Sequence, residues 1–329
     1  MKISILDGHA VNPGDISWEG FKAFGSVKVF DNTPQDKVIE HIGDSEVVLT
    51  NKTPVTEAVL SACKSVKYVG VLATGYNVVD LEACNRRKIP VTNVPDYSSS
   101  SVAQGVFAHI LEFTNNTGLH SQSVFSGEWI DSKDFCYWKK PLIELEGKKL
   151  GIYGFGNIGR RVCVIALAFG MDVLCFSRTR EKIIEYIDSL PEIQKHRVKP
   201  VDSDTLFKEC DVISFHVPLT KETEHIINRK TLSLVKPSAL IVNTARGGLA
   251  DEDAVKEALV SGRLGGYCCD VVEVEPMLKD NPLLEAPNCI ITPHLVWASK
   301  EARLRLLKIA ENNIRSFLAG KVENQVNSF

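Results

Sequence analysis

One stretch of this 329-residue chain indicates its fold class most clearly: Leu150-Gly-Ile-Tyr-Gly-Phe-Gly-Asn-Ile-Gly-Arg160. Its first residues predict a buried β-strand, and a helical pattern of apolar residues begins at Ile158. Between the two lie Gly154, Gly156 and Gly159, in the spacing G-x-G-x-x-G. These glycines permit a tight turn, close approach of the backbone to a pyrophosphate, and close packing of helix on strand. The stretch predicts a dinucleotide-binding unit, with a tight turn that binds no ligand as the alternative.

Strands and helices alternate on both sides of this unit. Short runs rich in Val and Ile, separated by helical patterns, are typical of buried strands in parallel sheets. One series of such runs precedes the glycine turn and a second begins with it. The first series has predicted strands at 3–6, 27–30, 47–50, 66–73 and 91–94 and helices at 35–42 and 56–63; the second has strands at 150–153, 173–176, 212–217, 240–244, 267–271 and 289–291.

The two series predict an α/β protein with two doubly wound parallel-sheet domains. The first series has too few helices to cover its sheet, so we expect the long amphipathic helix at 299–318 to return to it. This assigns residues 1–100 and 294–329 to one domain and residues 101–293 to the other. Residues 118–147 have no clear periodicity, and a segment of that length in a compact protein is usually functional.

Composition excludes several classes of function. The chain has 38 Lys and Arg against 41 Asp and Glu, a net charge of −3, which gives no general basis for binding nucleic acid. No apolar run approaches the roughly 18 residues of a membrane span. Nine cysteines without a C-x-x-C pair indicate neither a disulfide framework nor a metal site. We therefore expect a cytoplasmic globular protein without a metal.

Three charged or titratable side chains follow predicted strands of the second series. Arg246 comes after the strand at 240–244, Glu275 after that at 267–271, and His294 after that at 289–291. Parallel sheets bind ligands at the carboxyl ends of their strands. There an Arg can polarise a carbonyl, a His can transfer a proton, and a Glu can stabilise the protonated imidazole. Taken singly, each residue has an equally good structural explanation.

The segment after the strand at 173–176 should select the ribose of the dinucleotide. A carboxylate at this place accepts a hydrogen bond from the 2′-hydroxyl of NAD. Here the strand is followed by Ser177, Arg178, Thr179 and Arg180, and Asp172 lies at its other end. A hydroxyl and two guanidinium groups suit a 2′-phosphate better than a bare ribose. The alternative is that the arginines only form a solvated helix start.

The whole chain resembles the D-isomer-specific 2-hydroxyacid dehydrogenases, and within them the glycerate dehydrogenase/hydroxypyruvate reductase group. The resemblance spans nearly the whole chain in family order. The segments that carry it are VLATGYNVVD (71–80), VPDYSSSSVAQ (94–104), GFGNIGR (154–160), HVPLTKET (216–223), NTARGGLADE (243–252), DVVEVEP (270–276) and TPHLVWAS (292–299).

The resemblance implies roles for individual residues. Arg246, Glu275 and His294 match the catalytic Arg, Glu and His of the family, and the turn Thr74-Gly75-Tyr76 matches the loop that binds the substrate carboxylate together with Arg246. Asp270 matches a position beside the nicotinamide. The cofactor-binding residues implied in total are Gly154, Gly156, Asn157, Ile158, Gly159, Ser177, Arg178, Val217, Pro218, Thr244, Ala245, Asp270 and His294.

The resemblance also implies architecture and partners. It predicts a Rossmann cofactor domain inserted into a flavodoxin-like substrate domain, and a homodimer formed through an arm, for which residues 118–147 are the candidate. Trp138 would then reach the active site of the neighbouring subunit, or alternatively cover the underside of its own arm. Many NAD-using relatives carry Asp where this chain has Ser177, so we expect NADPH to be modestly preferred, with NADH also used.

The expected reaction is reversible hydride transfer between NAD(P)H and a small 2-keto acid, with hydroxypyruvate as first choice and glyoxylate as second. Two alternatives remain on the same fold. A dinucleotide-sensing corepressor would bind cofactor without turnover of any 2-keto acid. An enzyme that oxidises formate or phosphite would be identified by assays with those substrates.

Overall fold

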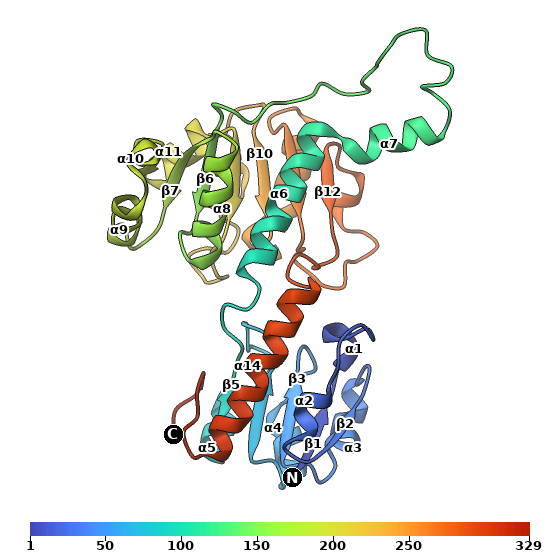
Figure 1. Cartoon of the computed structure of the whole chain (residues 1–329), viewed down its shortest axis with the longest axis vertical. Helices are drawn as coiled ribbons and strands as arrows, with labels where there is room; N and C mark the ends of the chain where they lie inside the picture. Colours follow the sequence, from blue (N-terminus) through green and yellow to red (C-terminus); the bar gives the residue numbers. More distant parts are fainter. The chain divides into compact units, whose positions relative to one another are not determined.

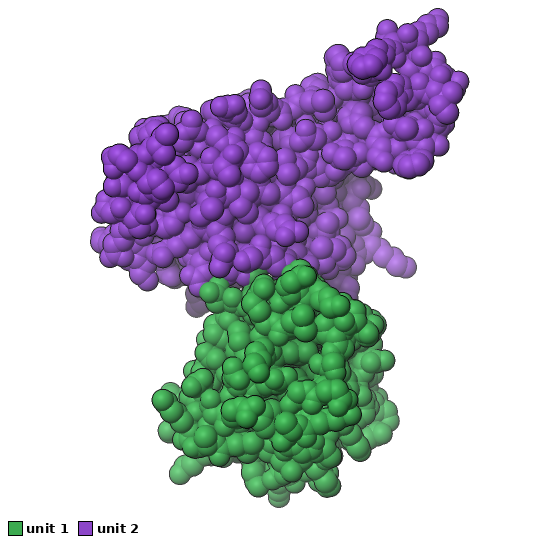
Figure 2. All heavy atoms as spheres, in the orientation of Figure 1, with its two compact units in different colours: residues 1–98, 298–329 green, residues 99–297 purple.

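The computed structural model covers residues 1–329, which divide into two compact units (Figure 2). Unit 1 comprises Met1–Ser98 and Ala298–Phe329, and unit 2 comprises Ser99–Trp297, so unit 2 is inserted into unit 1 in the sequence. The chain returns from unit 2 to unit 1 between residues 297 and 298, whereas we expected this domain boundary between residues 293 and 294. His294 consequently belongs to unit 2, because residues 294–296 are hydrogen-bonded to Asp270 of that unit.

Unit 1 is built on a five-stranded parallel sheet in the order β2-β1-β3-β4-β5. The C-terminal helix α14 contributes to its core, where the ring centroids of Tyr68 and Phe317 lie 4.9 Å apart. Its strands are β1 (Lys2–Ile5), β2 (Ser26–Val29), β3 (Val47–Thr50), β4 (Tyr68–Val71) and β5 (Val91–Thr92). Its helices are α1 (Gly8–Val11), α2 (Glu19–Lys22), η1 (Gln35–Lys37), α3 (Val38–Ile42), α4 (Glu57–Ala62), α5 (Leu81–Arg86) and α14 (Lys300–Leu318).

Unit 2 is built on a seven-stranded parallel sheet in the order β12-β11-β10-β9-β6-β7-β8. The strand order reverses between β6 and β9, which is where such sheets bind ligands. Its strands are β6 (Lys149–Tyr153), β7 (Asp172–Phe176), β8 (Val198–Pro200), β9 (Val212–Phe215), β10 (Leu240–Asn243), β11 (Gly266–Cys269) and β12 (Cys289–Ile291). Its helices are α6 (Ser99–Asn115), α7 (Thr117–Phe125), α8 (Asn157–Ala168), α9 (Glu181–Ser189), α10 (Glu192–Lys195), α11 (Ser203–Glu209), α12 (Arg229–Leu232), η2 (Gly247–Leu249), α13 (Glu252–Val260) and η3 (Pro282–Glu285).

Helices cover both faces of the sheet in unit 2. On one face α6 and α8 lie side by side (Figure 1), and their apolar side chains share a core with β6 and β7. On the other face α11, α12 and α13 supply a second core, which includes Phe207, Leu232 and Val255. Burial on both faces explains why β9, β10 and β11 are almost entirely apolar and buried along their whole length.

Helix α7 and the segment that follows it project from the body of unit 2 (Figure 1). This segment returns along α7, where the hydroxyls of Ser123 and Tyr137 lie 2.6 Å apart and the Lys139 N–H donates to His120 Nε2. The sequence shows no clear periodicity over residues 118–147, yet the first part of this segment is helical. The reason is that α7 is rich in small polar residues and carries no apolar stripe that a periodicity analysis could detect.

The predicted fold class is confirmed, since both units are doubly wound α/β structures with parallel sheets. Strands β3 and β12 have the predicted bounds, whereas the strand predicted at 66–73 is limited to Tyr68–Val71. Strand β8 was missed because it is three residues long and carries an exposed Lys199. No helix in the structure is long and apolar enough to span a membrane.

Candidate active site

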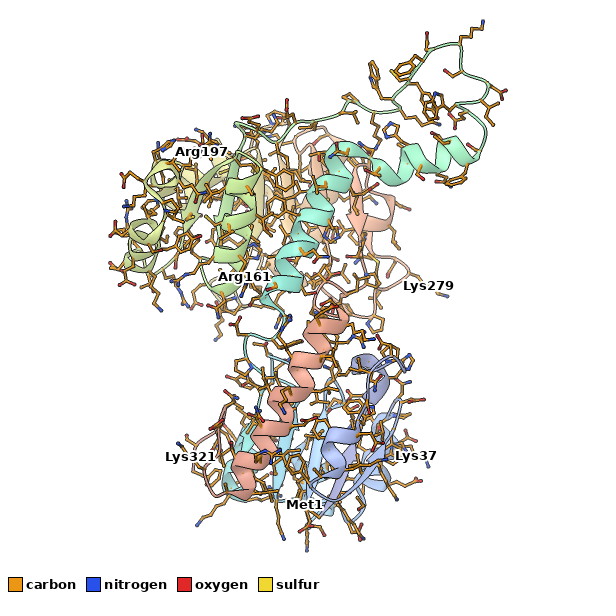
Figure 3. The ribbon with its side chains drawn as sticks, in the orientation of Figure 1. Met1, Lys37, Arg161, Arg197, Lys279 and Lys321 are labelled. Carbon is orange, nitrogen blue, oxygen red and sulfur yellow. The ribbon has the colours of Figure 1, made fainter.

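The candidate site residues of unit 2 follow the carboxyl ends of its strands. Because all seven strands are parallel, these ends meet at one edge of the sheet. Arg161 on α8 and Lys279 in the segment after β11 mark this edge in Figure 3. Residues that follow the adjacent strands β10, β11 and β12 are Arg246, Asp270, Glu275 and His294; those that follow β6, β7 and β9 are Gly154, Gly156, Ser177, Arg178, Val217 and Pro218.

His294 and Glu275 form a hydrogen-bonded pair. Nδ1 of His294 lies 2.7 Å from Oε2 of Glu275, while Oε1 of Glu275 accepts from the Val272 N–H at 3.2 Å. Both side chains remain about one-third exposed, at 31% and 35%. A ring nitrogen that donates to a carboxylate fixes the tautomer and the orientation of an imidazole. Nε2 of His294 has no protein partner and is open to a ligand.

Asp270 fixes the loop that carries His294. The backbone of His294 is left-handed, with a φ of 52°, and its N–H donates to the Asp270 carbonyl at 2.8 Å. The Asp270 carboxylate accepts from the N–H groups of Leu295 and Val296 at 2.9 and 3.0 Å, and from the Thr292 hydroxyl at 2.6 Å. Such a left-handed conformation persists where surrounding bonds determine it. The family resemblance implies a position for Asp270 beside a nicotinamide, and no sequence pattern indicates that it also anchors this loop.

Arg246 lies on a short turn directly after β10. Its side chain is exposed and donates to the Ala245 carbonyl at 2.6 Å, and its own carbonyl accepts from Asn243 at 2.9 Å. The next residue, Gly247, touches the backbone of Val272: a Cβ added there would lie 2.0 Å from the Val272 carbonyl. Only glycine permits this approach, which brings the Arg246 turn against the segment leading to Glu275.

The glycine turn after β6 has the geometry that a dinucleotide requires. Gly154 has a φ of 105°, and a Cβ there would lie 2.6 Å from the His216 carbonyl oxygen. A Cβ on Gly159 would lie 2.3 Å from the Gly154 carbonyl oxygen. By contrast, a Cβ on Gly156 would meet nothing within 4 Å, and no side chain caps α8, which begins at Asn157. Open space and uncapped N–H groups at a helix start fit a pyrophosphate.

A second observation also fits a dinucleotide. The hydroxyl of Thr244, directly after β10, is buried and has no hydrogen-bond partner within the protein. Buried polar groups are normally paired, so an unpaired hydroxyl at a ligand-binding edge is consistent with a ligand partner. Ala245 comes directly after Thr244, and Val217 and Pro218 come after β9, the strand next to β10 in the sheet. The residues present therefore fit a nicotinamide dinucleotide.

The segment after β7 is exposed and weakly bonded. The Ser177 hydroxyl accepts from the Thr179 N–H at 3.3 Å, and the side chains of Arg178 and Arg180 make no hydrogen bond or ion pair. The sequence did not reveal a carboxylate near Arg178. The Thr220 hydroxyl donates to Glu222 and lowers its pKa, and the positive charge of Arg178 adds to this effect. Glu222 thus opposes part of the positive charge that the two arginines supply.

The turn Thr74-Gly75-Tyr76 belongs to unit 1. The Thr74 hydroxyl donates to the Val94 carbonyl at 2.9 Å, and Asn93 donates to the Thr74 carbonyl at 2.8 Å. Asn313 of α14 donates in turn to the Asn93 carbonyl at 2.9 Å. The backbone N–H groups of the turn have no protein acceptor, so they are available to an anion.

Comparisons with known proteins agree with this arrangement. The family model of the D-isomer specific 2-hydroxyacid dehydrogenase NAD binding domain matches residues 107–296. A hydroxypyruvate reductase of Blautia hydrogenotrophica is 44% identical over 99% of this chain and 100% of its own length. A glycerate dehydrogenase of Methylorubrum extorquens is 37% identical over 89% of both chains. The chain therefore belongs to the D-isomer specific 2-hydroxyacid dehydrogenase family.

Solved structures of related proteins have the same fold. An acyclic imino acid reductase in complex with NADPH and D-Arg has a TM-score of 0.82 and 29% identity, covering 99% of this chain and 100% of its own. A D-lactate dehydrogenase of Aquifex aeolicus, complexed with NAD and lactic acid, has a TM-score of 0.79 and 29% identity, with complete coverage of both chains. This chain is thus an NAD(P)-dependent oxidoreductase of 2-hydroxy acids, as the sequence predicted.

Proposed function

We propose that this enzyme reduces hydroxypyruvate, and less efficiently glyoxylate, to the corresponding 2-hydroxy acid. The observation that carries the proposal is the 2.7 Å pair of His294 and Glu275, which leaves Nε2 of His294 open at the edge where ligands bind. The names of the relatives, a hydroxypyruvate reductase and a glycerate dehydrogenase, support the choice of substrate.

His294 is our candidate for the general acid. With Nδ1 donating to Glu275, the protonated imidazole presents its second N–H at Nε2 and can donate it to the alkoxide that forms at C2. Glu275 stabilises the imidazolium because opposite charges attract at this distance. His216, at the end of β9, is unsuited to proton donation, because burial lowers its pKa to about 3 and it stays neutral.

Arg246 and the turn Thr74–Tyr76 are our candidates for substrate binding. The guanidinium of Arg246 is exposed and can bond a carboxylate and a keto oxygen with its two terminal nitrogens. The unpaired N–H groups of Thr74, Gly75 and Tyr76 would receive the carboxylate. When bound, the nicotinamide cofactor supplies the hydride, and the protein supplies alignment and charge.

The glycine turn, α8 and Thr244 are our candidates for holding the cofactor, and we propose that both NADH and NADPH are used, with NADPH modestly preferred. Ser177 introduces no charge that would repel a 2′-phosphate, and the side chains of Arg178 and Arg180 make no hydrogen bond within the protein. The preference is modest because these arginines are exposed to solvent and salt, and because Glu222 lies near Arg178.

We also propose that the enzyme is a cytoplasmic homodimer formed through α7 and residues 126–147. This arm carries apolar side chains that a monomer leaves in water: Phe125 is 90% exposed, Ile130 86% and Phe135 91%. Exposed apolar patches of this kind mark interfaces. Trp138, which is 65% exposed, is the candidate for a side chain that reaches the neighbouring subunit.

The experiment that tests the proposed function is a panel of 2-keto acids assayed with NADH and with NADPH. We expect oxidation of either cofactor with hydroxypyruvate, followed in efficiency by glyoxylate. Cofactor binding without turnover of any 2-keto acid would instead favour a dinucleotide-sensing binding protein. Turnover of formate or phosphite alone would contradict the assignment of a keto-acid site.

A further inference from the structure

Helix α6 contacts the loop of His294 through three residues on one helical face. Ser101, Gly105 and His109 are spaced four residues apart, which places them on the same side of the helix. The Ser101 hydroxyl donates to the Val296 carbonyl at 2.6 Å. A Cβ on Gly105 would lie 2.5 Å from the Val296 side chain, so the helix and the loop touch there.

His109 extends this contact to Asp270 through Thr292. Nε2 of His109 lies 3.0 Å from the Thr292 hydroxyl, which lies 2.6 Å from Oδ1 of Asp270. His109 is 5% exposed and Asp270 is 1% exposed, and Thr292 between them is half-buried. The same Oδ1 accepts from the N–H of Leu295, the residue directly after His294. A series of side-chain hydrogen bonds thus runs from the core of α6 to the loop.

The direction of each hydrogen bond follows from the chemistry of the groups. A carboxylate only accepts, so Thr292 donates its hydroxyl proton to Asp270. The Thr292 oxygen is then free to accept from His109, whose ring must carry a proton on Nε2. Burial lowers the pKa of His109, which favours the neutral form of the ring. Nδ1 of the same ring is buried without a hydrogen-bond partner, so Nε2 is the nitrogen that connects His109 to Thr292.

We propose that His109 is a positioning residue for the reaction and acts through Thr292 and Asp270. It holds the Asp270 carboxylate where it can accept from the N–H groups of Leu295 and Val296, and it thereby maintains the left-handed backbone of His294. The inference rests on the proposed function of His294. It adds a residue that touches neither substrate nor cofactor and that lies 185 positions away in the sequence (294 − 109).

The first test compares His109→Leu with His109→Gln. Leucine fills the space but cannot donate, whereas the glutamine amide can replace the Nε2–H donor. We expect His109→Leu to lower kcat for hydroxypyruvate about 10- to 100-fold, the scale of a misplaced catalytic group, with cofactor affinity unchanged. His109→Gln should restore most of this activity. Equal activity of the two variants would overturn the proposal.

Thr114→Val is the matched control on the same helix. Thr114 is also buried, and its hydroxyl donates to the Ile110 carbonyl within α6, away from the His294 loop. The control should lose stability comparable to that of His109→Leu but keep kcat. If kcat falls as much in Thr114→Val as in His109→Leu, both losses result from a less stable helix, and the positioning role of His109 is contradicted.

A double variant tests whether His109 acts through Thr292. Thr292→Val should lower kcat, and adding His109→Leu to it should lower kcat no further, because the connection is already broken. Additive losses would contradict a common path.

Backbone amide signals of Leu295 and Val296 in the 15N-labelled enzyme give a readout that is independent of turnover. His109→Leu should shift both signals and His109→Gln should leave them near wild type. If the wild type turns over no keto acid but the signals shift, the positioning stands and the proposed function fails. If the wild type is active and the signals do not move, the positioning fails.

Discussion

Two regions at the carboxyl edge of the unit 2 sheet, one after β12 and one after β7, differ in how firmly hydrogen bonds hold their polar side chains. At the β12 end, His294 is fixed by Glu275 through its ring and by Asp270 through its backbone. At the β7 end, Ser177 has one weak bond to a neighbouring N–H, and Arg178 has no hydrogen bond or ion pair. A proton donor must be oriented to within fractions of an ångström, whereas a solvated cation can adapt to the phosphate it meets.

This difference determines what substitutions should do at each end. A substitution in the bonded region removes a group whose geometry the protein has already fixed, so the loss in rate should be large. A substitution in the exposed region removes a contact that water and salt weaken, so the change should be a few-fold. The following experiments test this contrast, in order of decreasing effect.

His294→Gln should have the largest effect. We expect kcat to fall by about 10²- to 10⁴-fold, the usual loss when a positioned proton donor is removed. Affinity for the reduced cofactor, measured by fluorescence titration, should change little, because the glycine turn and α8 remain intact. Near-full activity of this variant would show that another group supplies the proton.

Glu275→Gln should have the second largest effect. Without the carboxylate, the His294 ring loses the partner of opposite charge that holds it 2.7 Å away and stabilises the form that can donate a proton. A hydrogen bond to a charged group contributes about 1.5–3 kcal/mol, which corresponds to about 10- to 150-fold in rate. We therefore expect kcat for hydroxypyruvate to fall by this factor. A kcat close to that of the wild type would leave Glu275 a structural residue.

Gly156→Ala should separate binding from folding. A Cβ at this position meets no protein atom within 4 Å, so the melting temperature should stay close to wild type. The methyl group would occupy the open space where a pyrophosphate approaches, and cofactor affinity should fall at least about tenfold, or 1.4 kcal/mol. Gly159→Ala is the contrasting variant, because its Cβ would lie 2.3 Å from a backbone oxygen and should destabilise the fold. Unchanged cofactor affinity in Gly156→Ala would argue against a phosphate site here.

Substitutions after β7 should have the smallest effects. Arg178→Ala should lower the affinity for NADPH a few-fold and leave the affinity for NADH unchanged. Ser177→Asp should shift the ratio of kcat/KM toward NADH. Glu222→Gln should raise the affinity for NADPH, because it removes the negative charge near Arg178. If the wild type favours NADH by more than tenfold, about 1.4 kcal/mol, Arg178 is not a phosphate ligand.

Most of the fold was accessible from local patterns. Strands such as β3 and β12 are continuous apolar runs, and the glycine turn after β6 combines a strand, a turn and a helix start within eleven residues. Helix α7 was not accessible, because its stability does not depend on an apolar stripe. Strand β8 was missed for a related reason, since a three-residue edge strand carries too little pattern.

The site was accessible in its residue types but not in its connections. The ends of the predicted strands made Arg246, Glu275 and His294 candidates, and parallel strands must bring such ends to one edge. The hydrogen bonds of Thr292 with Asp270 and with His109 depend on side-chain directions. These partners are 22 and 183 positions away from Thr292 in the sequence. No periodicity records such contacts. Glu222 near Arg178 is a further case, because the two residues follow different strands.

Isotope transfer tests the account most directly. The enzyme is incubated with hydroxypyruvate and reduced cofactor that carries deuterium at both C4 positions of the nicotinamide, and the product is analysed for deuterium at C2 and for chirality. The account predicts D-glycerate that carries the label at C2, formed by the wild type and hardly at all by His294→Gln. Unlabelled glycerate, the L-isomer, or undiminished label transfer by His294→Gln would contradict it.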